Sequence, residues 1–310
     1  MKKILCIILA LSVCACALCA CAKEEQKKED VRKAMYSELQ KFYENKRPAD
    51  LNELSSLFAS GADLGEFDCS ALFGENVSDA DYVAAYCLLK KANHPLAEGA
   101  DAETRVTRLL SADIETLSTR ELYETVLALT LCGAKFDKDA VVQSLVLRQD
   151  EISGGSYDYP QTGGGSARVS AENAAYSLLT YMLVRDSVRT ALLEDALHDS
   201  ALVYLGNCIE EDTTVCGISG KPDAAVTAKV LVALMVCGVP QNGEIATALL
   251  NAIHNFAVFK NGALAGYRET EDGEAKRSTA AEIMFCVTSA LYENPYFAGT
   301  LSPAGGTQNN

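Results

Sequence analysis

The sequence predicts a mainly α-helical protein built from repeated pairs of helices. After residue 30, nearly every apolar cluster has helical spacing, and strict alternation of apolar and polar residues is scarce. A pattern also recurs along the chain: a polar start, a helix rich in small and aliphatic residues, a break, a second helix and a glycine-rich turn. The first helices of these units have centres about 50 residues apart, a period typical of stacked supersecondary units.

The opening segment of the chain is of the signal-peptide type. Lys2 and Lys3 precede an uncharged apolar run over 4–22, and the charged stretch KEEQKKED follows it. Near the end of the run, Leu18-Cys19-Ala20-Cys21 resembles a bacterial lipobox. That resemblance implies a diacylglycerol on the thiol of Cys21, which becomes the first residue after cleavage.

Two alternatives for this leader remain open. Val13-Cys14-Ala15-Cys16 is a poorer register of the same pattern, and about 20 apolar residues can also span a bilayer as an uncleaved helix. In each case the two lysines lie on the cytoplasmic side and the rest of the chain lies outside. We therefore expect a protein on the outer face of the cytoplasmic membrane, with the membrane as a partner through the lipid.

The rest of the chain divides into three parts after the signal peptide over 1–21. We expect a charged tether over 22–30, a helical-repeat domain over 31–298 and a disordered tail over 299–310. The formal net charge of -15 argues against a nucleic-acid surface, which needs a basic patch. Among the cysteines after the leader, Cys208 and Cys216 flank a predicted turn and either pair or stay free. The others have mostly apolar neighbours and are expected to be small buried hydrophobes.

The predicted domain opens with an amphipathic helix over 31–43, on which Val31, Met35, Leu39 and Phe42 share one face. The clearest internal match aligns 127–133 (LALTLCG) with 232–238 (VALMVCG), where we expect each glycine to end a helix in a left-handed conformation. The first helices of the successive units are predicted over 79–92, 119–134, 170–184, 222–239 and 278–292.

This organisation resembles the prenyltransferase and squalene-cyclase repeat superfamily over roughly residues 78–297. In that superfamily a glycine-aromatic turn leads to a helix with a small residue and an aliphatic centre, as in Gly262 to Tyr267 followed by Ser278-Thr-Ala-Ala-Glu282. The resemblance implies an α/α toroid, a barrel of helical hairpins. The alternative is an open α-helical repeat solenoid, which buries its apolar faces between neighbours equally well.

The catalytic signatures of that superfamily are missing. Asp79-Ala-Asp81 is followed by Tyr82 rather than by further acids, so we assign Asp79 and Asp81 to helix capping. The chain has no tryptophan, no Gly-x-Ser-x-Gly elbow and no phosphate loop, since Gly217–Pro222 lacks the required spacing. Its three histidines show no metal-ligand spacing and are assigned to solvated or capping positions. We therefore expect no metal, no cofactor and, on balance, no enzyme.

If the domain is a toroid, the starts of the first helices and the turns before them converge at one rim of the central cavity. Tyrosines and carboxylates at these places form a plausible polar and aromatic ligand site, although ordinary capping and packing explain each residue singly. The candidate residues are Tyr157, Asp158, Tyr159, Glu172, Asn173, Tyr176, Asp223, Thr227, Tyr267 and Glu282.

The main functional hypothesis is a surface-anchored lipoprotein whose toroid binds a ligand or partner without catalysis. A bulky small molecule such as a corrinoid, a cell-wall component or a protein fits this hypothesis, and a surface spacer or assembly module is a further possibility. The alternative is an enzyme of the terpenoid-cyclase and prenyltransferase-like fold that acts on a lipid or polysaccharide. In that case Asp223 and Glu282 are the expected general acid and base.

Overall fold

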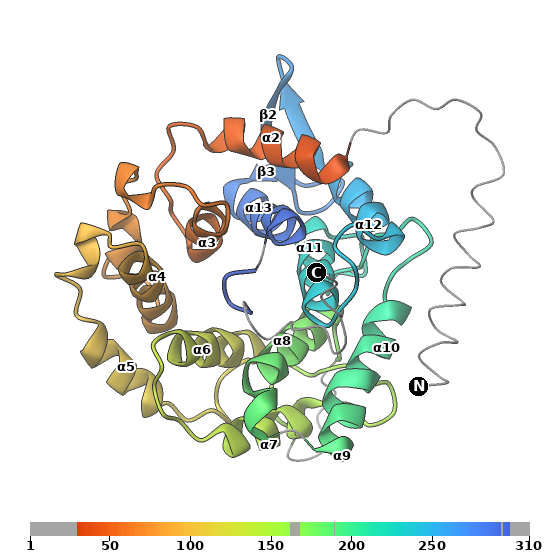
Figure 1. Ribbon diagram of the computed structural model, residues 1–310. Helices are drawn as coiled ribbons and strands as arrows, with labels where there is room; N and C mark the ends of the chain where they lie inside the picture. Colours follow the sequence, from red (N-terminus) through yellow and green to blue (C-terminus); the bar gives the residue numbers. More distant parts are fainter. Residues whose placement is uncertain (1–29, 162–167, 189, 293, 298–310) are drawn as a thin grey trace, which may run out of the picture.

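The described chain is an α/α toroid, as predicted, in which an inner ring of helices is surrounded by an outer ring (Figure 1). The computed structural model describes residues 30–161, 168–188, 190–292 and 294–297. The predicted signal peptide with Cys21, the tether up to residue 29 and the predicted tail lie outside these residues. No helix in the described ranges combines the length and hydropathy needed to span a bilayer.

The inner ring closes on itself. Each of its helices packs against the next along the chain, and the last packs against the first, so the open solenoid is excluded (Figure 1). Within the described residues the members of the ring are α3 (Leu51–Ala59), α4 (Asp79–Lys91), α6 (Thr119–Leu131), α8 (Ala171–Val188), α11 (Ala224–Val236) and α13 (Arg277–Leu291).

Shorter and more amphipathic helices cover the outside of this ring (Figure 1). One packs on α13, one on α4, two on α8 and one on α11. In that order they are α2 (Val31–Tyr43), α5 (Ala102–Leu110), α7 (Lys138–Arg148), α10 (Ala201–Asn207) and α12 (Glu244–His254). Short connecting helices are α9 (Ala191–Leu193), η1 (Leu64–Glu66), η2 (Ser70–Phe73), η3 (Pro95–Ala97) and the π-type η4 (Glu194–Ser200).

The different burial of the two rings follows from their sequences. In α11 every residue except Ala225 is buried, because neighbours of the same ring flank it and α12 covers it. Such a helix must be apolar all round. By contrast, α2 buries only Met35 and Leu39 completely, which confirms the amphipathic face expected of the opening helix.

The expected glycine caps are present at the ends of α6 and α11. Gly133 has φ +69° and Gly238 has φ +101°, both in the left-handed region. After α6, the amide of Gly133 donates to the carbonyl of Thr130 and the amide of Ala134 donates to that of Leu129. This is a Schellman pair, which satisfies carbonyls that the helix end leaves free.

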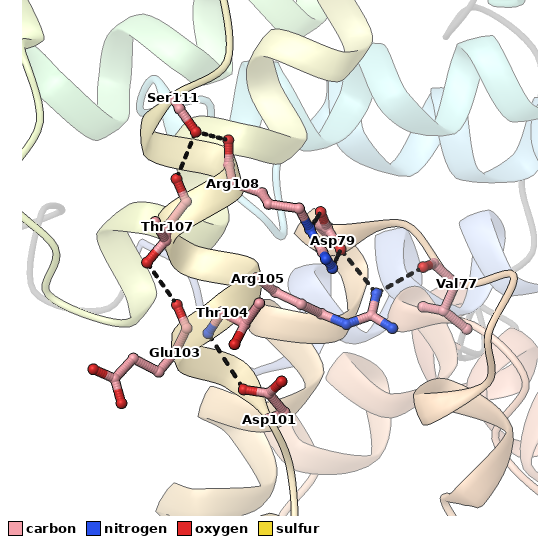
Figure 2. A network of polar contacts seen from close by, with 9 residues as sticks. All are labelled: Val77, Asp79, Asp101, Glu103, Thr104, Arg105, Thr107, Arg108 and Ser111. Atoms are coloured by element: carbon pink, nitrogen blue, oxygen red, sulfur yellow. Dashed lines mark hydrogen bonds and ion pairs between the residues drawn. The ribbon is translucent and has the colours of Figure 1, made fainter.

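The assignment of Asp79 and Asp81 to capping needs correction. The cap of α4 is Ser78, whose side-chain oxygen accepts from the amide of Asp81 at 3.0 Å. Asp79 instead binds two arginines of α5 (Figure 2). Its carboxylate accepts from Arg105 at 3.0 Å and, through both oxygens, from Arg108 at 2.7 Å. The hydrogen bond from Arg108 is the main reason why the pKa of Asp79 lies below its usual value.

A three-stranded antiparallel sheet was not predicted. Its strands are β1 (Ala257–Lys260), β2 (Ala263–Arg268) and β3 (Ala275–Lys276), and β2 lies in the middle. Asn261 and Gly262 form the turn between the first two strands, with φ values of 52° and 77°. Two positive φ angles in an Asn-Gly pair are typical of a type I′ hairpin. The sheet packs against α2 and α13, near the closure of the ring (Figure 1).

The ring closes between α3 and α13 through an ion pair whose carboxylate is buried. The guanidinium group of Arg277 donates to both carboxylate oxygens of Glu53, at 2.7 Å each. The amide of Ala49 adds a further bond to Glu53 at 2.8 Å, and the Glu53 side chain is only 3% exposed. The bonds between Arg277 and Glu53 join residues more than 200 positions apart, so they anchor the last inner helix to the first.

Replacing Glu53 with glutamine should lower the free energy of unfolding by about 1 kcal/mol, because Arg277 loses its charge-assisted bonds while its 40% exposed side chain stays hydrated. Urea unfolding followed by circular dichroism measures the loss. The matched control is Glu269→Gln, which removes an exposed partner of Lys276. If the Glu269 variant lost as much stability as the Glu53 variant, the ion pair at the ring closure would not be a special source of stability.

Candidate functional site

A cavity of about 110 Å³ lies in the centre of the toroid, and all the inner helices or their caps contribute to its wall. We call it the central cavity. Its polar side chains come from the beginnings of the inner helices, as expected for a ring in which these ends share one rim. The polar members are Asp50, Asn52, Asp81, Arg120, Glu124, Lys229 and Glu282, and the aromatic members are Tyr123, Tyr176, Phe285 and Tyr296.

Lys229 is the most deeply buried cation of the central cavity. Its Nζ lies 2.7 Å from Glu172 Oε1, 3.8 Å from Glu282 Oε1 and 4.5 Å from the ring centroid of Tyr176. Burial alone would lower the pKa of Lys229, but Glu282, Tyr176 and Glu172 outweigh it and hold the pKa above its usual value. The lysine is therefore a fixed positive charge that joins α11 to α8 and α13.

Arg120 and Glu124 form a second ion pair, one turn apart on α6. Arg120 Nε lies 2.7 Å from Glu124 Oε1, and the arginine reaches into solvent whereas the glutamate is largely buried. Burial raises the pKa of Glu124, although Arg120 opposes the shift. Both cations of the central cavity are thus already paired with carboxylates.

Asp50 and Asp81 are the carboxyl groups of the central cavity that lack a cationic partner within the described residues. Asp50 caps α3, and its Oδ1 accepts from the amide of Glu53 at 3.0 Å. Burial, followed by the charges of Glu53 and Glu282, raises the pKa of Asp50 to about 7. Asp81 lies in the first turn of α4.

Two pairs of aromatic rings form the apolar part of the cavity wall. Tyr123 and Tyr176 have ring centroids 5.4 Å apart, as do Phe285 and Tyr296. The hydroxyl of Tyr296 is hydrogen bonded to Ser55. Burial raises the pKa of Tyr176 to about 12, even though Lys229 opposes the shift. These tyrosines therefore stay neutral at physiological pH.

A wider, more open space of about 760 Å³ adjoins the central cavity and shares Arg120 and Tyr176 with it. We call it the outer cleft. Two exposed apolar side chains lie on its wall: Tyr159 is 49% exposed and Ile218 is 86% exposed. The other residues around it include Ser118, Asp158, Gln161, Arg168, Ser170, Glu172, Asn173, Cys216 and Gly217.

Six of the ten residues predicted to surround a ligand lie around these two spaces. The central cavity contains Glu282, both spaces contain Tyr176, and the outer cleft contains Asp158, Tyr159, Glu172 and Asn173.

The other four lie in neither wall. Tyr157 donates its hydroxyl to Asp150 at 3.1 Å, and Thr227 binds the backbone of Val215. Tyr267 is fully buried in β2. Asp223 is the cap of α11 and accepts from the amides of Ala225 and Val226. Asp223 is not among the residues that line the central cavity, unlike Asp50, the cap of α3.

Most of the polar cavity wall was not predicted from the sequence. Asp50, Arg120 and Glu124 were not singled out, and Asp81 was assigned to capping. Lys229 offered the clearest signal, because it is the one charged residue in the otherwise apolar helix 224–236. A buried lysine in such a helix requires carboxylate partners from neighbouring helices.

Histidines and cysteines do not build a site in the described part of the chain. No group of three His, Cys, Asp or Glu side chains there could hold a metal ion. His94 caps a short helix, while His198 and His254 contact the carboxylates of Asp199 and Glu38 at 2.8 Å. The seven cysteines among the described residues are free, including Cys208 and Cys216.

Comparison with known proteins identifies the fold. No protein-family model and no curated protein matches the chain. Among solved structures, a polysaccharide lyase is similar, with a TM-score of 0.53 and 11% identity over 84% of this chain and 96% of the lyase. The Lin0763 protein of Listeria innocua has a TM-score of 0.50 and 12% identity, and the match covers 84% of each chain. An unsaturated glucuronyl hydrolase mutant from Streptococcus agalactiae has a TM-score of 0.48 and 12% identity over 85% of this chain and 91% of the hydrolase.

These similarities overturn the expectation of a non-catalytic binding protein and the leaning against an enzyme. The polysaccharide lyase, an enzyme by its name, matches this toroid over 96% of its own length. The alternative from the sequence, an enzyme that acts on a polysaccharide, agrees better with this neighbour.

Replacing Lys229 with methionine should lower the free energy of unfolding by about 2 kcal/mol, because Glu172 and Glu282 lose their shared cation. Denaturant unfolding measures the loss. The double variant Lys229→Met with Glu282→Gln removes one of the stranded charges and should regain part of it. A double variant less stable than Lys229→Met alone would contradict the ion-pair explanation.

Proposed function

We propose that this protein is an enzyme that cleaves glycosidic bonds, with the reacting bond in the central cavity and the rest of an oligosaccharide in the outer cleft. The observation that carries the proposal is the pair Asp50 and Asp81, two carboxyl groups in different surroundings that face one cavity. Asp50 is buried, with its pKa raised to about 7, whereas Asp81 lies at a helix start. Hydrolysis of a glycoside needs one carboxylic acid and one carboxylate.

In the proposed mechanism Asp50 gives its proton to the oxygen of the leaving sugar as the glycosidic bond breaks. Asp81 takes a proton from water, and the water oxygen forms the new bond to the anomeric carbon. The two carboxyl groups then exchange their protons with solvent and return to their starting forms. Because the pKa of Asp50 is close to 7, its acid form is well populated at neutral pH, as a general acid requires.

The walls of both spaces support a sugar ligand. The tyrosine rings of the central cavity offer flat apolar faces, and the tyrosine hydroxyls offer hydrogen bonds at their edges. Tyr159 and Ile218 add exposed apolar area to the wall of the outer cleft. The similarity of the fold to a polysaccharide lyase also supports a carbohydrate substrate.

Activity should depend on both carboxyl groups. Asp50→Asn and Asp81→Asn are each expected to lower kcat by 10²-fold or more, because each removes a proton transfer while asparagine preserves the local packing. Asparagine also caps helices well, so α3 stays intact in the Asp50 variant. The measurement is the release of new reducing ends from a panel of oligosaccharides and polysaccharides.

The wild-type profile of kcat/KM should fall as the pH rises above about 7, because Asp50 loses the proton that it donates. Asp272→Asn, which changes an exposed carboxylate outside both spaces, is the matched control and should keep full activity. Release of unsaturated sugars would indicate elimination instead of hydrolysis and would contradict the mechanism. Full activity of the Asp50 variant would contradict the assignment of the acid.

We also propose that the enzyme is a lipoprotein held at the outer face of the cytoplasmic membrane by a lipid on Cys21. The lipobox over 18–21 and the two lysines near the start support this placement. The narrower relation to the prenyltransferase and squalene-cyclase repeats likewise stands as a proposal, supported by the toroid and by the matching segments 127–133 and 232–238.

Cys21→Ser should abolish the lipid and leave the precursor with its signal peptide uncleaved. Metabolic labelling of an expressing bacterium with a radioactive fatty acid measures the lipid, and gel mobility measures the cleavage. Cys19→Ser is the matched control and should be labelled and processed as the wild type. Equal labelling of the Cys21 variant would rule out this anchor and favour Cys16, the poorer register.

A further inference from the structure

The charges of the central cavity do not balance. Its wall carries the carboxyl groups of Asp50, Asp81, Glu124 and Glu282 but only two cations, Arg120 and Lys229. Glu124 already binds Arg120, and Lys229 is shared by Glu282 and Glu172. The wall therefore has an excess of negative charge at Asp81, to which Asp50 adds in its ionised form.

The cavity wall also contains polar groups that lack hydrogen-bond partners. The Asp81 carboxylate makes no hydrogen bond or ion pair with the described residues, and Asp50 has only backbone donors at its carboxylate. Tyr123 lines the cavity and is only 8% exposed, yet its hydroxyl has no hydrogen-bond partner in the described ranges. Buried polar groups are normally bonded, so an unpartnered one beside a cavity points to a missing ligand.

A metal ion does not fit the arrangement of these carboxyl groups. The described residues contain no cluster of three carboxylate, cysteine or histidine side chains close enough to hold one. The carboxyl groups instead come from the N-terminal parts of separate inner helices, and aromatic rings line the same wall. A larger organic cation with several donors can reach carboxylates spread around a wall, and its charge also gains from the aromatic faces.

We infer that the sugar bound in the central cavity carries a protonated amine, so that the enzyme acts on an oligosaccharide of amino sugars with free amino groups. This inference rests on the proposed glycosidase function and specifies its substrate class. The ammonium group donates to Asp81 and lies close to Asp50, while the sugar hydroxyls bond to Tyr123.

The same charges disfavour an acidic sugar. A uronate carboxylate would enter a wall whose two cations already have carboxylate partners, and it would meet Asp50 and Asp81 at close range. The formal net charge of -15 on the whole chain also repels a polyanion during approach. A polycation is attracted by the same field.

The first experiment is calorimetric titration of the full-length protein in detergent with three ligands of equal length: a glucosamine oligomer, its fully N-acetylated form and a galacturonate oligomer. The glucosamine oligomer should bind at least tenfold more tightly than the acetylated one, which has lost the positive charge, and the galacturonate oligomer should bind most weakly. Higher salt should reduce the advantage of the free amine.

Asp81→Asn then tests the position of the amine. It should weaken binding of the glucosamine oligomer about tenfold, as expected for the loss of one charge-assisted hydrogen bond, and leave binding of the acetylated oligomer unchanged. Asp272→Asn is the control and should bind all three ligands as the wild type does. Circular dichroism and thermal unfolding establish that both variants are folded.

The outcomes separate this inference from the proposed function. Equal binding of free-amine and acetylated oligomers, or tighter binding of galacturonate, overturns the amino-sugar specificity, and hydrolysis of uronate oligomers would still uphold a glycosidase. Tight binding of the glucosamine oligomer without release of reducing ends overturns the glycosidase and leaves the specificity standing. The comparison of ligands uses the unchanged protein, so a variant that fails to fold does not affect it.

Discussion

The structure depends on the contact between its last inner helix and its first. Without the packing of α13 on α2 and α3, the chain would be an open array of helical pairs, and its cavity wall would be incomplete. The ion pair of Arg277 with the buried Glu53 lies at this closure, where a mismatch would leave the Glu53 carboxylate without solvent or partner. The same closure brings Asp50, the cap of α3, close to Glu282 in α13.

Much of the fold could be predicted because the inner helices have centres of small and aliphatic residues and the opening outer helix is amphipathic. A helix such as α11 must be surrounded on nearly all sides, and a ring of such helices satisfies that need. The sheet escaped prediction because its strands are short, and the Asn261-Gly262 turn was interpreted as a glycine-rich loop before a helix. The Asn-Gly pair was in fact the stronger signal, since it favours a tight hairpin.

The site was harder to predict, because the same residue type serves two purposes at a helix start. Asp223 and Asp81 both occur where capping acids are common, yet Asp223 caps α11 whereas Ser78 caps α4 and leaves the Asp81 side chain available to the cavity. Local spacing does not distinguish these cases. The distinction depends on which way each helix start faces within the ring, and that is decided by packing between residues far apart in the sequence.

A closed ring also limits how such a protein can change in size. An open array of repeats can gain or lose a helical pair at one end and keep its other surfaces. In the ring described here every inner helix has two neighbours, so one added pair would widen the circumference and move every wall residue apart. The residues and loops around the opening can change without affecting the ring. The width of the central cavity, and so the size of a ligand that fits in it, depends on the number of helical pairs.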